Sequence, residues 1–214
     1  MKIYYHVNLE GYSNCYIITN PELKEAIIVD PGKITKESVQ NIENEQYNLV
    51  AVLITHNHGS HTDGLSTVRK IYNPRIYAAD SQAAGEDTIV LKGDGIFKIA
   101  DFTIGYLSVP GHSTDSMCYK IGNVIFTGDT LSAGKIGSTN NSYAKKTLIA
   151  NVQTKIFSQQ ECTTLLPGHG PPTSIEAEKF FNTMNFFTVE KYIISSRRKY
   201  CDRYYHQNNI NHTV

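Results

Sequence analysis

Four short polar segments, each placed directly after an apolar run, hold most of the histidines of this chain. Five of the eight histidines fall in them together with one aspartate, the six residues being His56, His58, His61, His112, Asp129 and His169. Loops that follow strands converge at one edge of a sheet, so residues far apart in the sequence can become neighbours there. Imidazole nitrogens and carboxylate oxygens are donors that zinc and iron accept. The pattern therefore predicts a metal site.

The apolar runs predict an α/β chain. Short runs bounded by turn residues indicate strands, and apolar residues at helical spacing indicate helices. On this basis strands are expected within residues 4–8, 15–19, 25–32, 49–55, 74–79, 97–112, 118–130 and 162–170. The segments 97–112 and 118–130 each hold a strand pair followed by a loop, and 25–32 and 162–170 each hold one strand followed by a loop. Helices are expected at 34–46, 64–72, 143–158 and 174–205, the last with a possible break at Asn and Met. The continuously apolar run at 49–55 is typical of a strand buried on both faces.

The charge balance argues against partners that recognise a strongly charged surface. Lys plus Arg and Asp plus Glu number 20 each, so we expect neither nucleic acid nor a membrane surface as a partner. The first residues lack the apolar core of a secretion signal, and no run approaches the roughly 18 apolar residues of a membrane span. We therefore expect a cytoplasmic protein with one domain, whose oligomeric state stays open.

Residues outside the four segments receive plainer interpretations. The cysteines, which are Cys15, Cys118, Cys162 and Cys201, form no Cys-x-x-Cys pair, so we expect buried free thiols. A role for Cys118 as a ligand or nucleophile is the minor alternative, because it lies close to His112. The remaining histidines, which are His6, His206 and His212, are expected at the surface.

The polar segments and their order resemble the metallo-β-lactamase superfamily, and within it the small hydrolases similar to glyoxalase II, the hydroxyacylglutathione hydrolases. The first motif of that family, T-H-x-H-x-D-H-x-x-G, is matched by Thr55, His56, His58, His61 and Gly64. The other motifs are matched by Asp30-Pro31-Gly32, Pro110-Gly111-His112, Phe126-Thr127-Gly128-Asp129-Thr130 and Pro167-Gly168-His169-Gly170-Pro171. The resemblance runs from about residue 14 to residue 182.

The resemblance implies an αββα sandwich over residues 1–206, including C-terminal helices, followed by a flexible tail at 207–214. It implies a first metal held by His56, His58 and His112, a second held by His61 and His169, and Asp129 as the bridging, catalytic carboxylate. The metal would be one or two zinc ions, and iron is also admissible. Asp30 would either orient a ligand or serve only as a turn residue before proline.

The chain departs from the family pattern at the second metal. The Asp of the first motif is Ser60 here, and a neutral hydroxyl is a poor ligand. Three outcomes follow: a weak second site, a single metal at the first site, or the same fold with different chemistry. Two later positions also depart from the family pattern: Ser138 stands where an Arg is expected, and Asn140 where an Asp is expected. The missing Arg makes an anionic glutathione thioester a less secure substrate, and Lys135 can supply the positive charge instead.

The resemblance implies a metal-dependent hydrolase that acts on a small-molecule thioester or related acyl substrate, with a hydroxide held by the metals as nucleophile. Two alternatives remain open: a mononuclear iron persulfide dioxygenase, and a non-catalytic protein that senses or binds metal or oxygen. A basic run near the C-terminus forms either a solvated helix face or a clamp for an anion, and it comprises Arg197, Arg198, Lys199 and Arg203.

Overall fold

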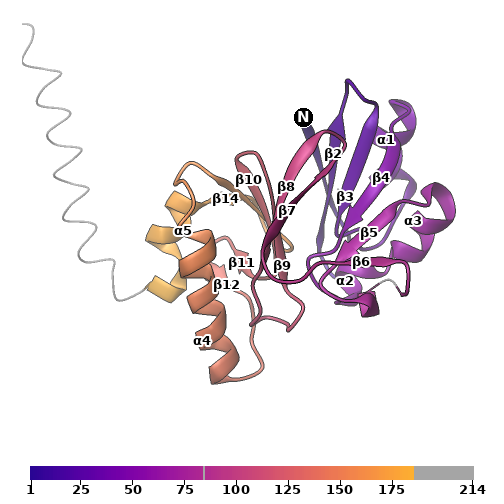
Figure 1. Ribbon diagram of the computed structural model, residues 1–214. Helices are drawn as coiled ribbons and strands as arrows, with labels where there is room; N and C mark the ends of the chain where they lie inside the picture. Colours follow the sequence, from indigo (N-terminus) through magenta and orange to yellow (C-terminus); the bar gives the residue numbers. More distant parts are fainter. Residues whose placement is uncertain (84, 186–214) are drawn as a thin grey trace, which may run out of the picture.

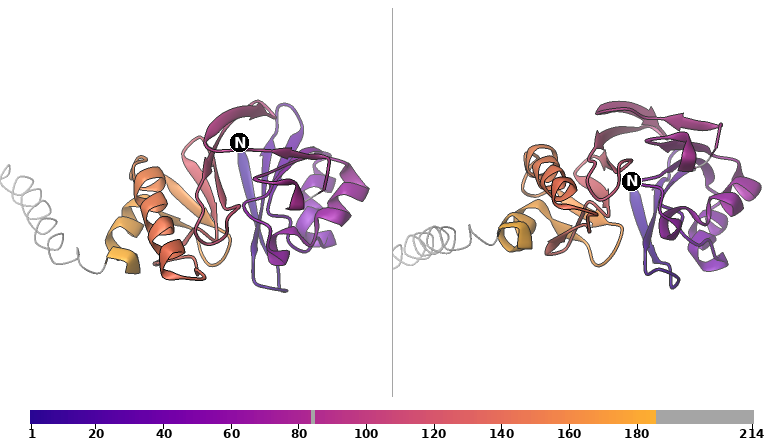
Figure 2. Two further views of the ribbon diagram at one scale, coloured as in Figure 1. Left: turned by 60° about the horizontal axis from the view of Figure 1, so that its bottom comes forward. Right: turned by 90° about the horizontal axis from the view of Figure 1, so that it is seen from below.

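The chain folds into four layers, with two sheets packed face to face and helices on their outer faces (Figure 1). The structure is a computed structural model that describes residues 1–83 and 85–185. The predicted αββα sandwich is confirmed. Two further directions of view show the same separation, with α1 and α3 outside one sheet and α4 and α5 outside the other (Figure 2).

The first sheet is built from the N-terminal part of the chain. Its strands lie in the order β1 (Lys2–Val7), β2 (Asn14–Asn20), β3 (Glu25–Val29), β4 (Asn48–Leu53), β5 (Arg75–Ala78) and β6 (Thr88–Val90). The first three strands are antiparallel, and β3 to β6 are parallel. The helices α1 (Lys36–Asn44) and α3 (Leu65–Tyr72) lie in the crossovers from β3 to β4 and from β4 to β5. A four-residue helix, α2 (Gly59–Thr62), follows β4.

The second sheet takes the rest of the described chain. Its order is β14 (Thr173–Ser174), β13 (Thr164–Pro167), β10 (Val124–Gly128), β9 (Met117–Ile121), β8 (Phe102–Ser108) and β7 (Gly95–Ile99). A small hairpin of β11 (Leu131–Ser132) and β12 (Lys135–Ile136) follows β10. Outside the sheet lie α4 (Ser142–Asn151), continued by a π-helical turn at Val152–Ile156, and α5 (Ile175–Phe181).

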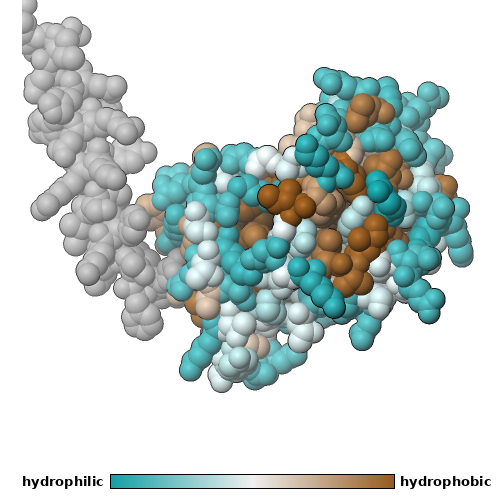
Figure 3. Space-filling model, in the orientation of Figure 1, coloured by the Kyte–Doolittle hydropathy of each residue, from teal (hydrophilic) through white to brown (hydrophobic). Residues whose placement is uncertain are grey.

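Alternation along the central strands creates three apolar layers. Tyr16 and Ile18 of β2 enter the layer between the sheets, whereas Cys15 and Ile17 pack toward the helices outside the first sheet. Because successive side chains of a strand point to opposite faces, a strand covered on both faces must be apolar throughout. The outer surface is mixed, with hydrophobic residues showing between polar ones in the view of Figure 3.

Several predictions on individual residues need correction. Cys15 and Cys118 are buried as expected, but Cys162 is exposed because it lies in the loop before β13. His6 is half-buried rather than at the surface, since it lies on β1 facing the cavity beside α1, and its Nε2 is buried. Residue Cys201 and the histidines at 206 and 212 lie outside the described residues.

The helix predicted from residue 174 is interrupted soon after it begins. The helix expected from residue 174 ends at Phe181, because Asn182 adopts an extended backbone, and residues 183–185 form a short 3-10 turn, which is where the sequence places a possible break at Asn and Met. The basic run at 197–203 and the expected tail at 207–214 lie outside the described residues. Within residues 1–83 and 85–185, no helix has the length and apolar character needed to cross a membrane.

Candidate metal centre

The four polar segments meet at one edge of the two sheets. The parallel strands β10 and β13 bring the loops with Asp129 and His169 together, and the Gly168 amide donates to the Gly128 carbonyl at 2.8 Å. The Met117 amide, at the start of β9, donates to the Thr55 carbonyl at 2.7 Å and so joins the loop after β4 to the second sheet. The six residues that the sequence singles out are all brought together here.

Four of the six form one group of donor atoms around a common point. His58 Nδ1 lies 2.9 Å from His56 Nε2 and 3.2 Å from His112 Nε2. Asp129 Oδ2 lies 3.9 Å from His56 Nε2 and 3.7 Å from His112 Nε2. A tetrahedral ion at 2.0–2.1 Å from each donor separates the donors by about 3.3 Å. The spacing of this four-donor group therefore fits a metal ion.

The other two histidines form a three-donor group with the second oxygen of Asp129. Its Oδ1 lies 3.5 Å from His61 Nε2 and 2.7 Å from His169 Nδ1. The His61 nitrogen is buried and has no hydrogen-bond partner. Since a buried polar atom without a partner is costly, this nitrogen fits a cation between itself and the carboxylate. Asp129 thus presents one oxygen to each group.

In four of the five histidines, the ring nitrogen that points away from the donor groups forms a hydrogen bond with a neighbouring group. These contacts orient the rings and leave the inward nitrogens as donors. The partners are the Thr55 hydroxyl for His56 (3.1 Å), Asp30 for His61 (3.0 Å), the Ser138 carbonyl for His112 (2.9 Å) and the Gly11 carbonyl for His169 (3.0 Å). The sequence indicated only Asp30 for such a role.

The electrostatics of the cluster suit a cation. Burial, followed by the charge of His61, lowers the pKa of His56 to about 3, so its ring is neutral at pH 7. Burial alone would raise the pKa of Asp129, but His169 at hydrogen-bond distance and the nearby charge of His61 outweigh it and hold that pKa far below its usual range. Burial alone would lower the pKa of His61, but Asp30 and Asp129 outweigh it and raise it to about 10. The carboxylates of Asp30 and Asp129 therefore stabilise positive charge at this edge of the sheets.

Asp30 orients His61 and holds the start of the histidine loop. Its side chain is 2% exposed, and it accepts from the Thr55 amide at 2.8 Å and the Thr55 hydroxyl at 2.6 Å, as well as from His61. Its backbone has a φ of 53°, so it also forms the turn before Pro31. Both interpretations left open by the sequence therefore apply to this residue.

We expect Asp30→Asn to weaken metal binding at the three-donor group by about 10- to 100-fold, the usual effect of losing a partner of a ligand. The amide cannot accept at both atoms, so the orientation of His61 is lost. Competition with a chromophoric chelator measures the dissociation constants. Asp87→Asn is the matched control, because Asp87 is exposed on the loop before β6. Equal affinities in the two variants would contradict this role.

The donor groups open into a cleft of about 320 Å³ walled by the β11–β12 hairpin. Its lining residues are His112, Asp129, Ser132, Lys135, Ile136, Gly137, Ser138 and His169. A Cβ on Gly137 would lie 1.9 Å from the Asp129 carbonyl oxygen, so only glycine fits there. Ser138, which replaces the expected Arg, contacts His112 through its backbone, and exposed Lys135 places a positive charge at the cleft.

Glu178 on α5 is a buried carboxylate that the sequence did not single out. It is 2% exposed and accepts from the Gly134 amide at 3.0 and 3.1 Å, from the Thr173 hydroxyl at 2.7 Å and from Asn182 Nδ2 at 2.6 Å. Gly134 is the turn of the β11–β12 hairpin. Glu178 therefore holds one wall of the cleft in place. Its position in a helix beside one other acidic residue, Glu176, gave no signal of this role.

We expect Glu178→Gln to lower the free energy of unfolding by about 2 kcal/mol, because a neutral amide presents an N–H group to three donors. Metal content should stay unchanged, since the hydrogen bonds of Glu178 to Gly134, Thr173 and Asn182 hold the hairpin and the helix end. Urea unfolding and elemental analysis measure the two quantities. Glu176→Gln, on the exposed side of the same helix, is the control. If Glu178→Gln loses metal as well as stability, Glu178 acts on the metal centre and not only on the hairpin.

Comparison with known proteins agrees with this geometry. The family model described as the metallo-β-lactamase superfamily matches residues 9–84. Similar proteins include the probable metallo-hydrolase YqgX of Bacillus subtilis, 28% identical over 83% of this chain and 94% of the relative. The probable polyketide biosynthesis zinc-dependent hydrolase BaeB of Bacillus velezensis is 27% identical over 87% and 86%. The hydroxyacylglutathione hydrolase GloC of Haemophilus influenzae is 28% identical over 79% and 91%.

Solved structures show the same fold. BLEG-1, a B3 metallo-β-lactamase, superposes with a TM-score of 0.74 at 27% identity, over 83% of this chain and 96% of that chain. ETHE1 from Myxococcus xanthus superposes with a TM-score of 0.76 at 21% identity, over 86% and 84%. The family model over residues 9–84, the relatives and the fold agree in their similarity to the metallo-β-lactamase superfamily.

Proposed function

We propose that this protein is a metal-dependent hydrolase that cleaves a thioester or related acyl bond in a small molecule. The observation that carries the proposal is the convergence of five histidines on the two oxygens of Asp129 beside an open cleft. The relatives named as metallo-hydrolases, a zinc-dependent hydrolase and a hydroxyacylglutathione hydrolase support it. Zinc is the favoured metal, and the donor set also admits iron.

The donor set fits the metal, with His56, His58, His112 and Asp129 as one set of ligands and His61, His169 and Asp129 as the other. A metal held in such a site polarises a carbonyl group and lowers the pKa of water toward neutrality. The protein contributes the arrangement around it. Asp129 remains ionised between the two groups, the fixed rings keep the donors in place, and the β11–β12 hairpin positions the substrate in the cleft.

The test is hydrolysis by the metal-loaded protein. We expect zinc-loaded protein to hydrolyse S-lactoylglutathione or another acyl thioester, and His112→Ala to lose both the metal of the four-donor group and the activity. Oxygen consumption with glutathione persulfide by iron-loaded protein would support a persulfide dioxygenase instead. Bound metal without turnover of either substrate would support a sensing or binding protein, and absence of metal binding would exclude all three.

The charge of Lys135 predicts a preference for substrates with an anionic group. We expect Lys135→Glu to raise KM for an anionic thioester about tenfold, the loss of one charge-assisted contact, and to leave KM for a neutral thioester unchanged. Steady-state kinetics with both substrates measure the difference. Lys70→Glu on α3 carries the same charge change on an exposed outer helix and serves as the control. Equal effects on both substrates would contradict the assignment.

A further inference from the structure

The loop between β1 and β2, residues 8–13, lies against both Ser60 and His169. The Gly11 carbonyl accepts from His169 Nε2 at 3.0 Å, and Ser13 pairs with His169 as a short β-bridge. On its other side, the Ser13 hydroxyl donates to the Ser60 carbonyl at 2.5 Å. The loop therefore connects the position where the first motif lacks its aspartate to the last histidine of the three-donor group.

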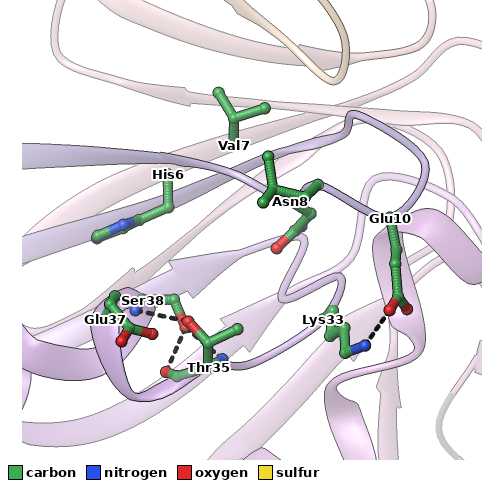
Figure 4. Close-up of a pocket in the computed structure, with 9 residues that line it drawn as sticks. His6, Val7, Asn8, Glu10, Lys33, Thr35, Glu37 and Ser38 are labelled. Atoms are coloured by element: carbon green, nitrogen blue, oxygen red, sulfur yellow. Dashed lines mark hydrogen bonds and ion pairs between the residues drawn. The ribbon is translucent and has the colours of Figure 1, made fainter.

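The loop is held in place by the protein around it. Within it, the Asn8 amide donates to the Ser13 carbonyl at 2.8 Å, and Asn8 Nδ2 donates to the Ser13 hydroxyl at 3.0 Å. At its outer side, Glu10 forms an ion pair with Lys33, and both residues line a cavity of about 510 Å³ beside the start of α1 (Figure 4). A loop with these contacts holds its carbonyl groups in fixed directions.

Gly11 and Ser60 can lie together only because both are small. Gly11 has a φ of 81°, and a Cβ added to it would lie 3.0 Å from Ser60 Cβ. A side chain at position 11 would therefore be strained by its backbone and would also press on Ser60. Additional γ atoms at position 60 would crowd the same contact. Either change would move the Gly11 carbonyl away from His169.

The Gly11 carbonyl decides which nitrogen His169 offers to Asp129. A carbonyl oxygen only accepts, so Nε2 donates to Gly11 and Nδ1 is left facing Asp129 Oδ1 at 2.7 Å. The His169 side chain is 33% exposed, so packing alone does not fix its ring. In metal sites, a partner on the outer nitrogen of a histidine fixes the ring and strengthens binding.

We infer that the β1–β2 loop controls a second, weaker metal position, made by His61, Asp129 and His169, through the contact of Gly11 with His169. This inference rests on the proposed metal centre. The four-donor group holds its ion with one more protein ligand, so it fills first. The three-donor position fills second, and its affinity depends on the loop, whereas that of the four-donor group does not.

Titration of metal-free protein with Zn²⁺ or Co²⁺ tests the inference. Equilibrium dialysis with elemental analysis gives two dissociation constants, and we expect the second in the unaltered protein to be at least about tenfold larger. Gly11→Ala should raise the second constant about 10- to 100-fold further and leave the first unchanged. Gly85→Ala is the matched control, since Gly85 has a φ of 82° and no atom within 4 Å of an added Cβ.

A second pair of variants changes the other side of the contact. Ser60→Val adds a second γ atom beside Gly11 and should weaken only the second position, whereas Ser60→Ala keeps the small size and should leave both constants unchanged. Circular dichroism shows whether each variant is folded. The Ser60 pair tests the inference on its own if Gly11→Ala folds poorly.

Three results would overturn the inference: a single bound metal at any concentration, equal constants in Gly11→Ala and Gly85→Ala, or equal loss at both positions. These results differ from failure of the proposed function. If the four-donor group of the unaltered protein binds no metal, the metal centre itself is wrong. If that group binds metal and the protein hydrolyses thioesters while Gly11→Ala changes nothing, only the control by the loop is wrong.

Discussion

Asp129→Asn is expected to remove metal from both donor groups and to lower kcat/KM for thioester hydrolysis by at least about 10³-fold, which is about 4 kcal/mol. Asp129 presents Oδ2 to one group and Oδ1 to the other, and it is the carboxylate of both. An amide keeps the shape but offers one oxygen and no charge. Neither group then has an anionic ligand, so both positions weaken together.

Elemental analysis after dialysis and hydrolysis assays measure this effect. Asp63→Asn is the control, because Asp63 is an exposed carboxylate at the end of α2 that belongs to neither donor group. Full metal content in Asp129→Asn would show that the histidines alone hold the ions. Loss of metal in Asp63→Asn would show that Asp63 replaces the carboxylate missing from position 60.

Ser60→Asp is expected to tighten metal binding at the three-donor group by at least about tenfold, because a carboxylate adds a charged ligand. The added atoms lie beyond Cβ, so the contact of Ser60 Cβ with Gly11 is kept. Metal titration measures the second dissociation constant. Ser60→Asn has the same size without the charge and separates the ligand effect from crowding. If the two variants bind equally, the side chain at position 60 does not reach the metal.

The six candidate ligands could be predicted because each follows an apolar run. The run before His56 predicts a strand buried on both faces, and the runs before Asp129 and His169 predict β10 and β13. Parallel strands of one sheet end at a common edge, which brings the loops with Asp129 and His169 together. The packing of the second sheet against the first then joins them to the loop after β4. The side-chain types then indicate the donors.

Apart from Asp30, the partners of these ligands could not be predicted, because they depend on tertiary contacts. Backbone carbonyls at Gly11 and Ser138 have no signature in the sequence, although they orient His169 and His112. The short strands β6, β11, β12 and β14 contain two or three residues each, too few for alternation to show. Glu178 acts through an amide more than forty residues away in sequence.

The ligands are divided between the two halves of the sandwich. The first sheet carries the loops with His56, His58 and His61, and the second carries those with His112, Asp129 and His169. An ion in the four-donor group would therefore crosslink the two sheets, in addition to the apolar layer between them. An ion that binds only the native state stabilises it by mass action. The free energy needed to separate the two sheets would therefore rise with the concentration of free metal.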